Sequence, residues 1–140
     1  MLALGAQAAW LGTRFLLAEE MPIHDDYRRR LIAAAETDAQ RYPNLYSVGW
    51  PDSPHRALRN STADAWQAAG RPPLAQRPGY GDVIAHFASG EPIVRYEPAP
   101  PMTGTTGNIE ALSMWAGQGV ALAKKSRPAA EIVAELTARL

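Results

Sequence analysis

The 140-residue chain contains no cysteine, which excludes disulfides, thiolate metal sites, iron–sulfur clusters and thiol nucleophiles. It also carries no net charge, because 14 lysine and arginine residues are matched by 14 aspartate and glutamate residues. No net field therefore draws the chain toward nucleic acid or an anionic membrane. The composition predicts a cytoplasmic protein that binds neither of them.

Long apolar runs are also missing, since none reaches the roughly 20 residues that a membrane-spanning helix needs. The apolar residues 1–17 resemble a signal peptide, but Arg14 interrupts them and no basic residue precedes them. We therefore expect no export. There is no internal repeat or low-complexity tract, and the length suits one domain.

Proline and glycine are present but unevenly placed, and they mark the connections of the chain. Residues 71–81 and 97–107 are too rich in proline to form a helix or a central strand. Between them, Val83–Phe87 and Pro92–Tyr96 are two short apolar runs on either side of Ser89-Gly90. This pattern predicts a small β-hairpin near 83–96.

Helical periodicity is visible in four later segments. Asp25 or Asp26 begins the first, Ser53 caps the second, which stops at Gly70, and Ser126 caps the last. Ala129, Ile132, Val133, Leu136 and Leu140 are expected on one face of the last helix. Arginines 28–30 are interpreted as the solvated face of the first, with an anion site as the alternative. The expected helices are 23–37, 54–69, 109–124 and 126–140.

The first 20 residues follow a different pattern. Residues 2–6 are interpreted as the end of a helix closed by Gly5, and Ala8–Leu11 as a strand buried on both faces. Thr13 is placed to cap a helix over 14–20. The strand lacks partners in the chain, and unpaired buried amides are costly, so we expect its neighbours upstream of Met1. A strand in this setting is typical of the last repeat of a (β/α)₈ barrel.

The turn after this strand has the chemistry of an anion site. Gly12 lets an anion approach the backbone, the first amides of a helix are free to donate, and the Thr13 hydroxyl adds a donor. Many strand-to-helix turns contain Gly-Thr and bind nothing, so the turn alone does not establish a ligand. It indicates half of a phosphate site.

Seven segments in order resemble the nitronate monooxygenase (2-nitropropane dioxygenase) family, whose members are flavin mononucleotide barrels. The similarity covers nearly the whole chain, and the ordered set is far more specific than any single segment. The segments are Ala3–Ala6, Trp10–Phe15, Pro54–Ser61, Arg71–Pro73, Ile93–Tyr96, Met114–Val120 and Arg127–Val133.

The resemblance implies an α/β fold: the C-terminal fragment of a flavin-binding (β/α)₈ TIM barrel with a mainly helical insertion, predominantly helical as a chain. Residues 1–20 would supply the last barrel strand and the phosphate turn. Residues 21–106 would form the insertion or substrate domain, and residues 107–140 the helices that return to the barrel.

The implied activity is FMN-dependent oxidation of alkyl nitronates with dioxygen. The expected cofactor-binding residues are Leu11, Gly12, Thr13 and Gln118. No catalytic residue is expected here, because the family's histidine base and second phosphate loop would precede Met1. His24, His55 and His86 do not match that base, and no pair has metal-ligand spacing. No metal site is expected.

Gly117 and Gly119 flank Gln118 inside an expected helix, where each glycine costs up to about 1 kcal/mol. They indicate close approach either to a neighbouring element or to the wall of the flavin cavity. Trp115 either lines the same region or belongs to the core.

Two other functions remain open. One is a non-catalytic interaction module that completes a barrel with a partner chain or associates with itself through the strand edge and the last helix. The other is a related FMN barrel that reduces enoyl thioesters. The fragment is expected to be inactive alone in each case.

Overall fold

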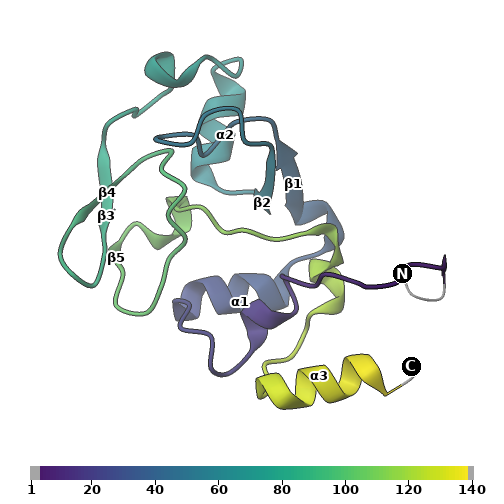
Figure 1. Cartoon of the computed structure of the whole chain (residues 1–140). Coiled ribbons are helices and arrows are strands. Elements are labelled where there is room, and N and C mark those ends of the chain that lie inside the picture. The colour runs from purple at the N-terminus through teal and green to yellow at the C-terminus, as the bar shows by residue number, and fades with distance from the viewer. Residues whose placement is uncertain (1–3, 139–140) are drawn as a thin grey trace.

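The computed structural model describes residues 4–138, which form short helices and two small antiparallel sheets joined by much irregular chain (Figure 1). The expected predominance of helix is not observed in this range, and none of its helices has both the length and the apolarity to cross a membrane. The elements are α1 (Asp25–Ala33), β1 (Ala39–Tyr42), β2 (His55–Leu58), α2 (Ser61–Ala68), β3 (Val83–His86), β4 (Pro92–Val94), β5 (Thr106–Gly107) and α3 (Ala129–Thr137), with 3-10 helices at Phe15–Leu17, Glu36–Asp38, Leu74–Gln76, Ile109–Ala111 and Gln118–Leu122.

Two sheets lie on different sides of the molecule (Figure 1). Strands β1 and β2 pair antiparallel with Arg41 opposite Arg56. Strand β3 pairs antiparallel with both β4 and β5, in the order β4-β3-β5. The hairpin expected near 83–96 is therefore confirmed, and β5 adds a third strand to it.

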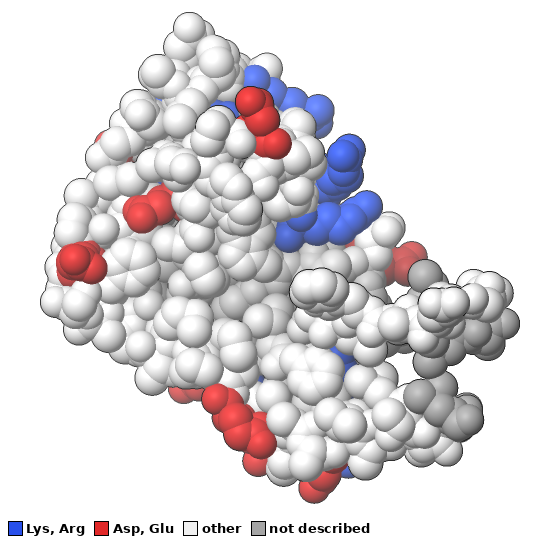
Figure 2. Space-filling model, viewed as in Figure 1, with Lys and Arg blue, Asp and Glu red and all other residues white. Residues whose placement is uncertain are grey.

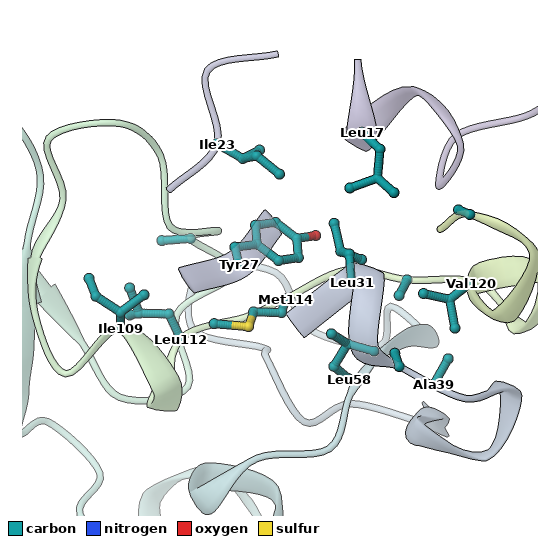
Figure 3. Close-up of a cluster of buried hydrophobic side chains, with 14 of the residues drawn as sticks. Leu17, Ile23, Tyr27, Leu31, Ala39, Leu58, Ile109, Leu112, Met114 and Val120 are labelled. Carbon is teal, nitrogen blue, oxygen red and sulfur yellow. The ribbon is translucent and has the colours of Figure 1, made fainter. Parts of the chain in front are cut away.

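Helix α1 lies at the centre of the main core (Figure 3). Tyr27 and Leu31, one turn apart on its inner face, are both fully buried. They pack with Met114 and Val120 from the C-terminal part and Leu17 from the N-terminal part. The Tyr27 hydroxyl donates a 2.6 Å hydrogen bond to the Trp115 carbonyl. Helix α1 thus joins distant segments of the chain.

A second, aromatic core lies beneath α2 and the β1–β2 pair. Trp66 and Tyr96 stack on the guanidinium of Arg77, at 5.7 and 5.3 Å from the ring centroids. Arg77 is only 4% exposed and donates to the Leu45 carbonyl (2.7 Å) and the Ser47 hydroxyl (3.1 Å). Its charge is held by carbonyl dipoles and aromatic faces.

The helix expected over 54–69 is wrong in its first half. His55–Leu58 is strand β2, because its backbone pairs with β1, and Leu58 N also donates to the Met114 carbonyl (2.8 Å). The helix begins at Ser61, after Asn60 accepts a hydrogen bond from Ala63 N as the N-cap. Its expected stop is confirmed, since Gly70 has φ +80° and follows the last turn.

The helix expected over 109–124 is also wrong. Residues 112–116 are not helical, and Ala116 N donates to the Arg56 carbonyl (3.2 Å). Only the 3-10 helices at Ile109–Ala111 and Gln118–Leu122 remain. Pairing with β2 and the glycines at 117 and 119 together account for the break.

The last helix is confirmed as α3, but its cap differs from the expectation. The Glu20 carboxylate accepts from Ala129 N at 2.9 and 3.0 Å, whereas the Ser126 hydroxyl donates to the Leu17 carbonyl (2.9 Å). Along the apolar face expected for this helix, Ile132 is buried, Val133 is 49% exposed and Leu136 is 38% exposed. Leu140, the end of the expected helix, lies outside the described residues.

The first helix ends earlier than expected, and its arginines are more than a solvated face. Helix α1 stops at Ala33. Arg28 donates to the carbonyls of Ala18 and Met21, while Arg30 reaches Glu110 and the Arg59 carbonyl. These bonds attach α1 to its neighbours.

The expected strand Ala8–Leu11 does not form in this chain. Residues 8–11 are exposed and, across residues 4–138, belong to no β-ladder. The physical reason is the one given by the sequence: no neighbouring strand is there to pair with it. Gly5 does have the positive φ (+89°) expected of a helix end, while Leu2 and Ala3 lie outside the described residues.

Candidate phosphate-binding turn

The turn Gly12–Arg14 folds around a single carbonyl. Phe15 N and Leu16 N both donate to the Gly12 oxygen, at 3.0 and 3.3 Å, and open the 3-10 helix Phe15–Leu17. The expected helix over 14–20 is therefore one short turn. Over the described part of the chain, the amides of Gly12, Thr13 and Arg14 have no hydrogen-bond acceptor. Three consecutive donors are left for a ligand or for water.

The sequence predicted that Thr13 caps the turn that follows it, but the Thr13 side chain makes no capping hydrogen bond there. Its hydroxyl oxygen instead accepts a 2.9 Å hydrogen bond from Gly117 N, across 104 positions of sequence. A Cβ added at Gly117 would lie 3.4 Å from this oxygen. This is an ordinary van der Waals distance, so the contact between Gly117 and the turn does not by itself require glycine at this position. Since the hydroxyl oxygen is the acceptor, its proton stays available to an anion.

The turn lines a groove of about 340 Å³ together with the C-terminal part of the chain. This volume lies at the lower end of the range for small-molecule sites. Three of the four expected cofactor residues, Leu11, Gly12 and Thr13, line it. Gln118 is exposed and is not part of the lining, but its neighbour Gly119 is. The other lining residues are Trp10, Arg14, Leu122, Ala123, Glu135 and Leu136.

Basic side chains surround the turn. Arg14 borders this groove and also an adjacent one that contains Lys124, Lys125 and Arg127. Arg14 itself donates to the Lys125 carbonyl (3.0 Å) and pairs with Glu135 (3.3 Å). Glu135 and Glu131, which pair with Arg14 and Arg127, lower the local positive charge, and Lys124 and Lys125 leave it positive.

These additional groove residues were not expected from the sequence. Leu122 is 87% exposed. It lies outside the apolar stripe predicted for 109–124, and this position was the signal in the sequence that could have separated it from the core. Leu136 was expected on the apolar face of the last helix. Only the tertiary contact between the two ends of the chain brings Leu122, Glu135 and Leu136 to the turn.

Trp115 lies away from this groove. It packs edge-on against His55 and Tyr46, with ring centroids 5.0 and 5.6 Å apart. Of the two interpretations of Trp115, the structure therefore supports a position in the core. Gly117 contacts the turn and Gly119 lines the groove. That this groove is the wall of a flavin cavity stays a prediction.

Each histidine has a local role or none. His24 caps α1 by accepting from Asp26 N (3.1 Å), and His86 is exposed on β3. His55 Nδ1 contacts the Ser53 carbonyl (2.8 Å) and its Nε2 accepts from Tyr46 N (3.3 Å), which fixes a neutral tautomer. No cluster of three acidic or histidine side chains suited to a metal occurs among residues 4–138.

His55 makes stability dependent on pH. Burial lowers its pKa below the ordinary value of 6.5, and the nearby Arg77 charge acts in the same direction, against the Ser53 hydrogen bond. The unfolded chain therefore takes up a proton first as the pH falls. This contribution to stability is complete above about pH 6.5 and is lost below it. We expect the urea concentration at the unfolding midpoint to decrease when the pH is lowered from 7.5 to 5.5, and to decrease less in His55→Gln. His86→Gln should keep the full decrease, and an equal loss in both variants would contradict this role.

The fold of this chain is similar to that of a solved structure. The fold is similar to that of FabK from Thermotoga maritima, with a TM-score of 0.64 over 94% of this chain and 36% of that one, at 23% identity. At this identity the likeness shows the fold alone.

The family model for nitronate monooxygenase matches residues 1–139. A nitronate monooxygenase of Paraburkholderia phytofirmans (strain DSM 17436 / LMG 22146 / PsJN) is 34% identical over 99% of this chain. The chain belongs to the nitronate monooxygenase family, as its sequence motifs predicted. It spans about a third of the length of the curated relative that it matches, since the matched part is 33% of that protein.

Proposed function

We propose that this chain supplies the phosphate-binding part of an FMN-dependent nitronate monooxygenase, an enzyme that oxidises alkyl nitronates with dioxygen. The observation that carries the proposal is the set of donors at the turn. The amides of Gly12, Thr13 and Arg14 have no acceptor in the described chain, and a hydrogen bond from Gly117 N fixes the Thr13 hydroxyl beside them. Family membership favours nitronate oxidation over reduction of an enoyl thioester.

The donor set of the turn suits a phosphate monoester. Backbone amides and a hydroxyl proton are the groups that commonly bind phosphate at the start of a helix, and the nearby cations add attraction. Gly12, Thr13 and Arg14 would hold the phosphate, and Leu11 and Gly119 would form the walls. Gln118 remains a proposed contact from outside the present groove. Bound FMN would supply the redox chemistry between nitronate and dioxygen.

The proton-abstracting base is assigned to another part of the enzyme. His55 uses both ring nitrogens within the aromatic core, and neither His24 nor His86 lines the groove, so none of the three is placed to act as that base. We therefore propose that the chain alone does not turn over nitronates. The division into 1–20, 21–106 and 107–140 is retained as a proposal, in which the middle part borders the substrate.

Amide chemical shifts in a titration with FMN test this proposal. FMN and inorganic phosphate should shift the ¹⁵N–¹H signals of Gly12, Thr13 and Arg14, while riboflavin, which lacks the phosphate, should not. Thr13→Val removes the hydroxyl donor, and a hydrogen bond to a charged group contributes about 1.5–3 kcal/mol, so FMN affinity should fall about tenfold or more.

Matched variants separate a phosphate contact from a structural effect. Thr13→Ser keeps the hydroxyl and should retain affinity, and Thr106→Val changes an exposed threonine on β5 and should have no effect. Equal shifts with riboflavin and FMN, or shifts confined to other parts of the chain, would overturn the proposed site.

A further inference from the structure

Large exposed apolar side chains are concentrated on the face that carries the groove. Trp10 is 99% exposed and Leu122 87%, and Leu11 and Leu136 line the same groove. Val133 is exposed one turn earlier on α3. In Figure 2 the N-terminal segment and the region of α3 form two protrusions with a gap between them, and the N-terminal one is largely uncharged. We define Trp10, Leu11, Leu122, Val133 and Leu136 as the end face.

The backbone beside this face is also without partners. From Ala6 to Leu11, no amide or carbonyl makes a backbone hydrogen bond within the described chain. Figure 1 shows the N-terminal segment leaving the body of the molecule next to α3. An apolar segment with free backbone donors and acceptors is suited to pairing with a strand edge.

The rest of the molecule does not require a covering partner. Tyr27, Leu31 and Met114 are fully buried in the main core, and Arg77 and Tyr96 are buried in the aromatic one. Of the other large apolar side chains that are exposed, Leu4 lies in the N-terminal segment, and Trp50, Tyr80 and Val83 belong to separate turns and the β3 edge. Among residues 4–138, exposed large apolar side chains are therefore grouped at the end face and its N-terminal segment and isolated elsewhere.

We propose that the end face is the docking surface for the remaining two thirds of the nitronate monooxygenase fold, which binds it even when supplied as a separate chain. Its strands would pair with residues 8–11, and its apolar helix surface would cover Leu122, Val133 and Leu136. The occupant is specified by length, because this chain accounts for 33% of the Paraburkholderia relative and 36% of FabK. A second copy of this chain would bring the same end face, in which no described residue belongs to a strand that could pair with residues 8–11.

The inference rests on the proposed function, because the same groove is assigned to the flavin phosphate, but it is measured without flavin. The 140-residue chain is co-expressed, with an affinity tag, with the part of the Paraburkholderia relative that lies outside the matched region. We expect the two to copurify as a 1:1 complex in sedimentation, in the presence or absence of FMN. Loss of flavin binding with an intact complex would then count against the function and not against the docking.

Variants test the two kinds of contact separately. Trp10→Ser and Leu122→Asp should weaken the complex at least about tenfold, as expected of central apolar contacts. Ala9→Pro removes a backbone donor and should weaken it to a similar degree, although the free chain uses no such bond at Ala9 and should keep its stability. Trp50→Ser and Val83→Asp, exposed elsewhere, are the matched controls and should bind normally.

The opposite results are equally clear. Absence of a complex between the two soluble polypeptides would overturn the proposal, as would equal losses in the control variants. Self-association of the 140-residue chain that Trp10→Ser and Leu122→Asp abolish would assign the end face to a second copy. Normal binding by Ala9→Pro would overturn the strand pairing.

Discussion

Replacing Arg77 with methionine is expected to lower the free energy of unfolding by about 3–5 kcal/mol, as when one partner of a buried polar network is removed. Methionine has a similar length but donates no hydrogen bond, so the Leu45 carbonyl and the Ser47 hydroxyl would lose their donor at a buried site. The stacking on Trp66 and Tyr96 would also be lost. Burial already lowers the pKa of Arg77, so the hydrogen bonds and ring faces must offset a real desolvation cost.

Arg71→Met is the matched control for this experiment. Arg71 also lies over Trp66, at 5.8 Å, but it is exposed. Its loss should cost no more than about 1 kcal/mol. Urea unfolding followed by tryptophan fluorescence measures both variants. Equal destabilisation by the two would show that stacking on Trp66, and not the buried hydrogen bonds, is the stabilising contribution.

The second large effect is expected at Asn60, with Asn60→Ala lowering the free energy of unfolding by about 2–4 kcal/mol. The Asn60 side chain is buried and caps α2 by accepting from Ala63 N (3.0 Å). Its amide nitrogen donates to the Tyr46 hydroxyl and the Leu112 carbonyl, both at 2.8 Å. Alanine therefore removes a helix cap and leaves buried polar atoms unpaired at the same time.

Thermal unfolding with Asn60→Asp and Asn108→Ala tests this account. Asp keeps the cap acceptor but cannot donate to the Tyr46 and Leu112 oxygens, so it should be destabilised by a comparable amount at neutral pH. Asn108 is exposed and makes no side-chain cap bond, so its change to alanine should have little effect. Full stability of Asn60→Asp would show that only the cap matters.

The sequence correctly predicted elements whose contacts join residues close together in the chain. The β3–β4 hairpin followed from two apolar runs around Ser89-Gly90, and its ladder lies within 12 residues. Helix α3 followed from Pro128 in its first turn and a regular apolar pattern. The end of α2 followed from Gly70, whose positive φ is accessible to glycine at little cost.

Where long-range contacts decide the structure, the sequence pattern misled. The helical spacing over 54–69 does not reveal that β1 pairs with His55–Leu58, and the pattern over 109–124 does not reveal that residues 112–116 run beside β2. Tertiary pairing overrides weak local propensity in both cases. The strand Ala8–Leu11 differs, because its pattern indicates a parallel sheet that is not found among residues 4–138.

Only part of the proposed phosphate site could be predicted from the sequence. Gly12 and Thr13 are adjacent to each other and were recognisable as a turn with anion-binding chemistry. Their partner Gly117 is 104 positions away from Thr13, and no local spacing relates the two. The cap of α3 is equally remote, since the Glu20 carboxylate bonds to Ala129 N.

These remote contacts impose an order on folding during translation, which adds about 5–20 residues per second from the N-terminus. Thr13, Ala18 and Glu20 all take partners between Gly117 and Ala129. On the ribosome the β1–β2 and β3–β4 pairs can form while these three residues still have no partner. The Gly12–Arg14 turn is thus anchored only after the last segment has left the exit tunnel, and a nascent chain stalled before Gly117 would hold its hairpins but not its turn.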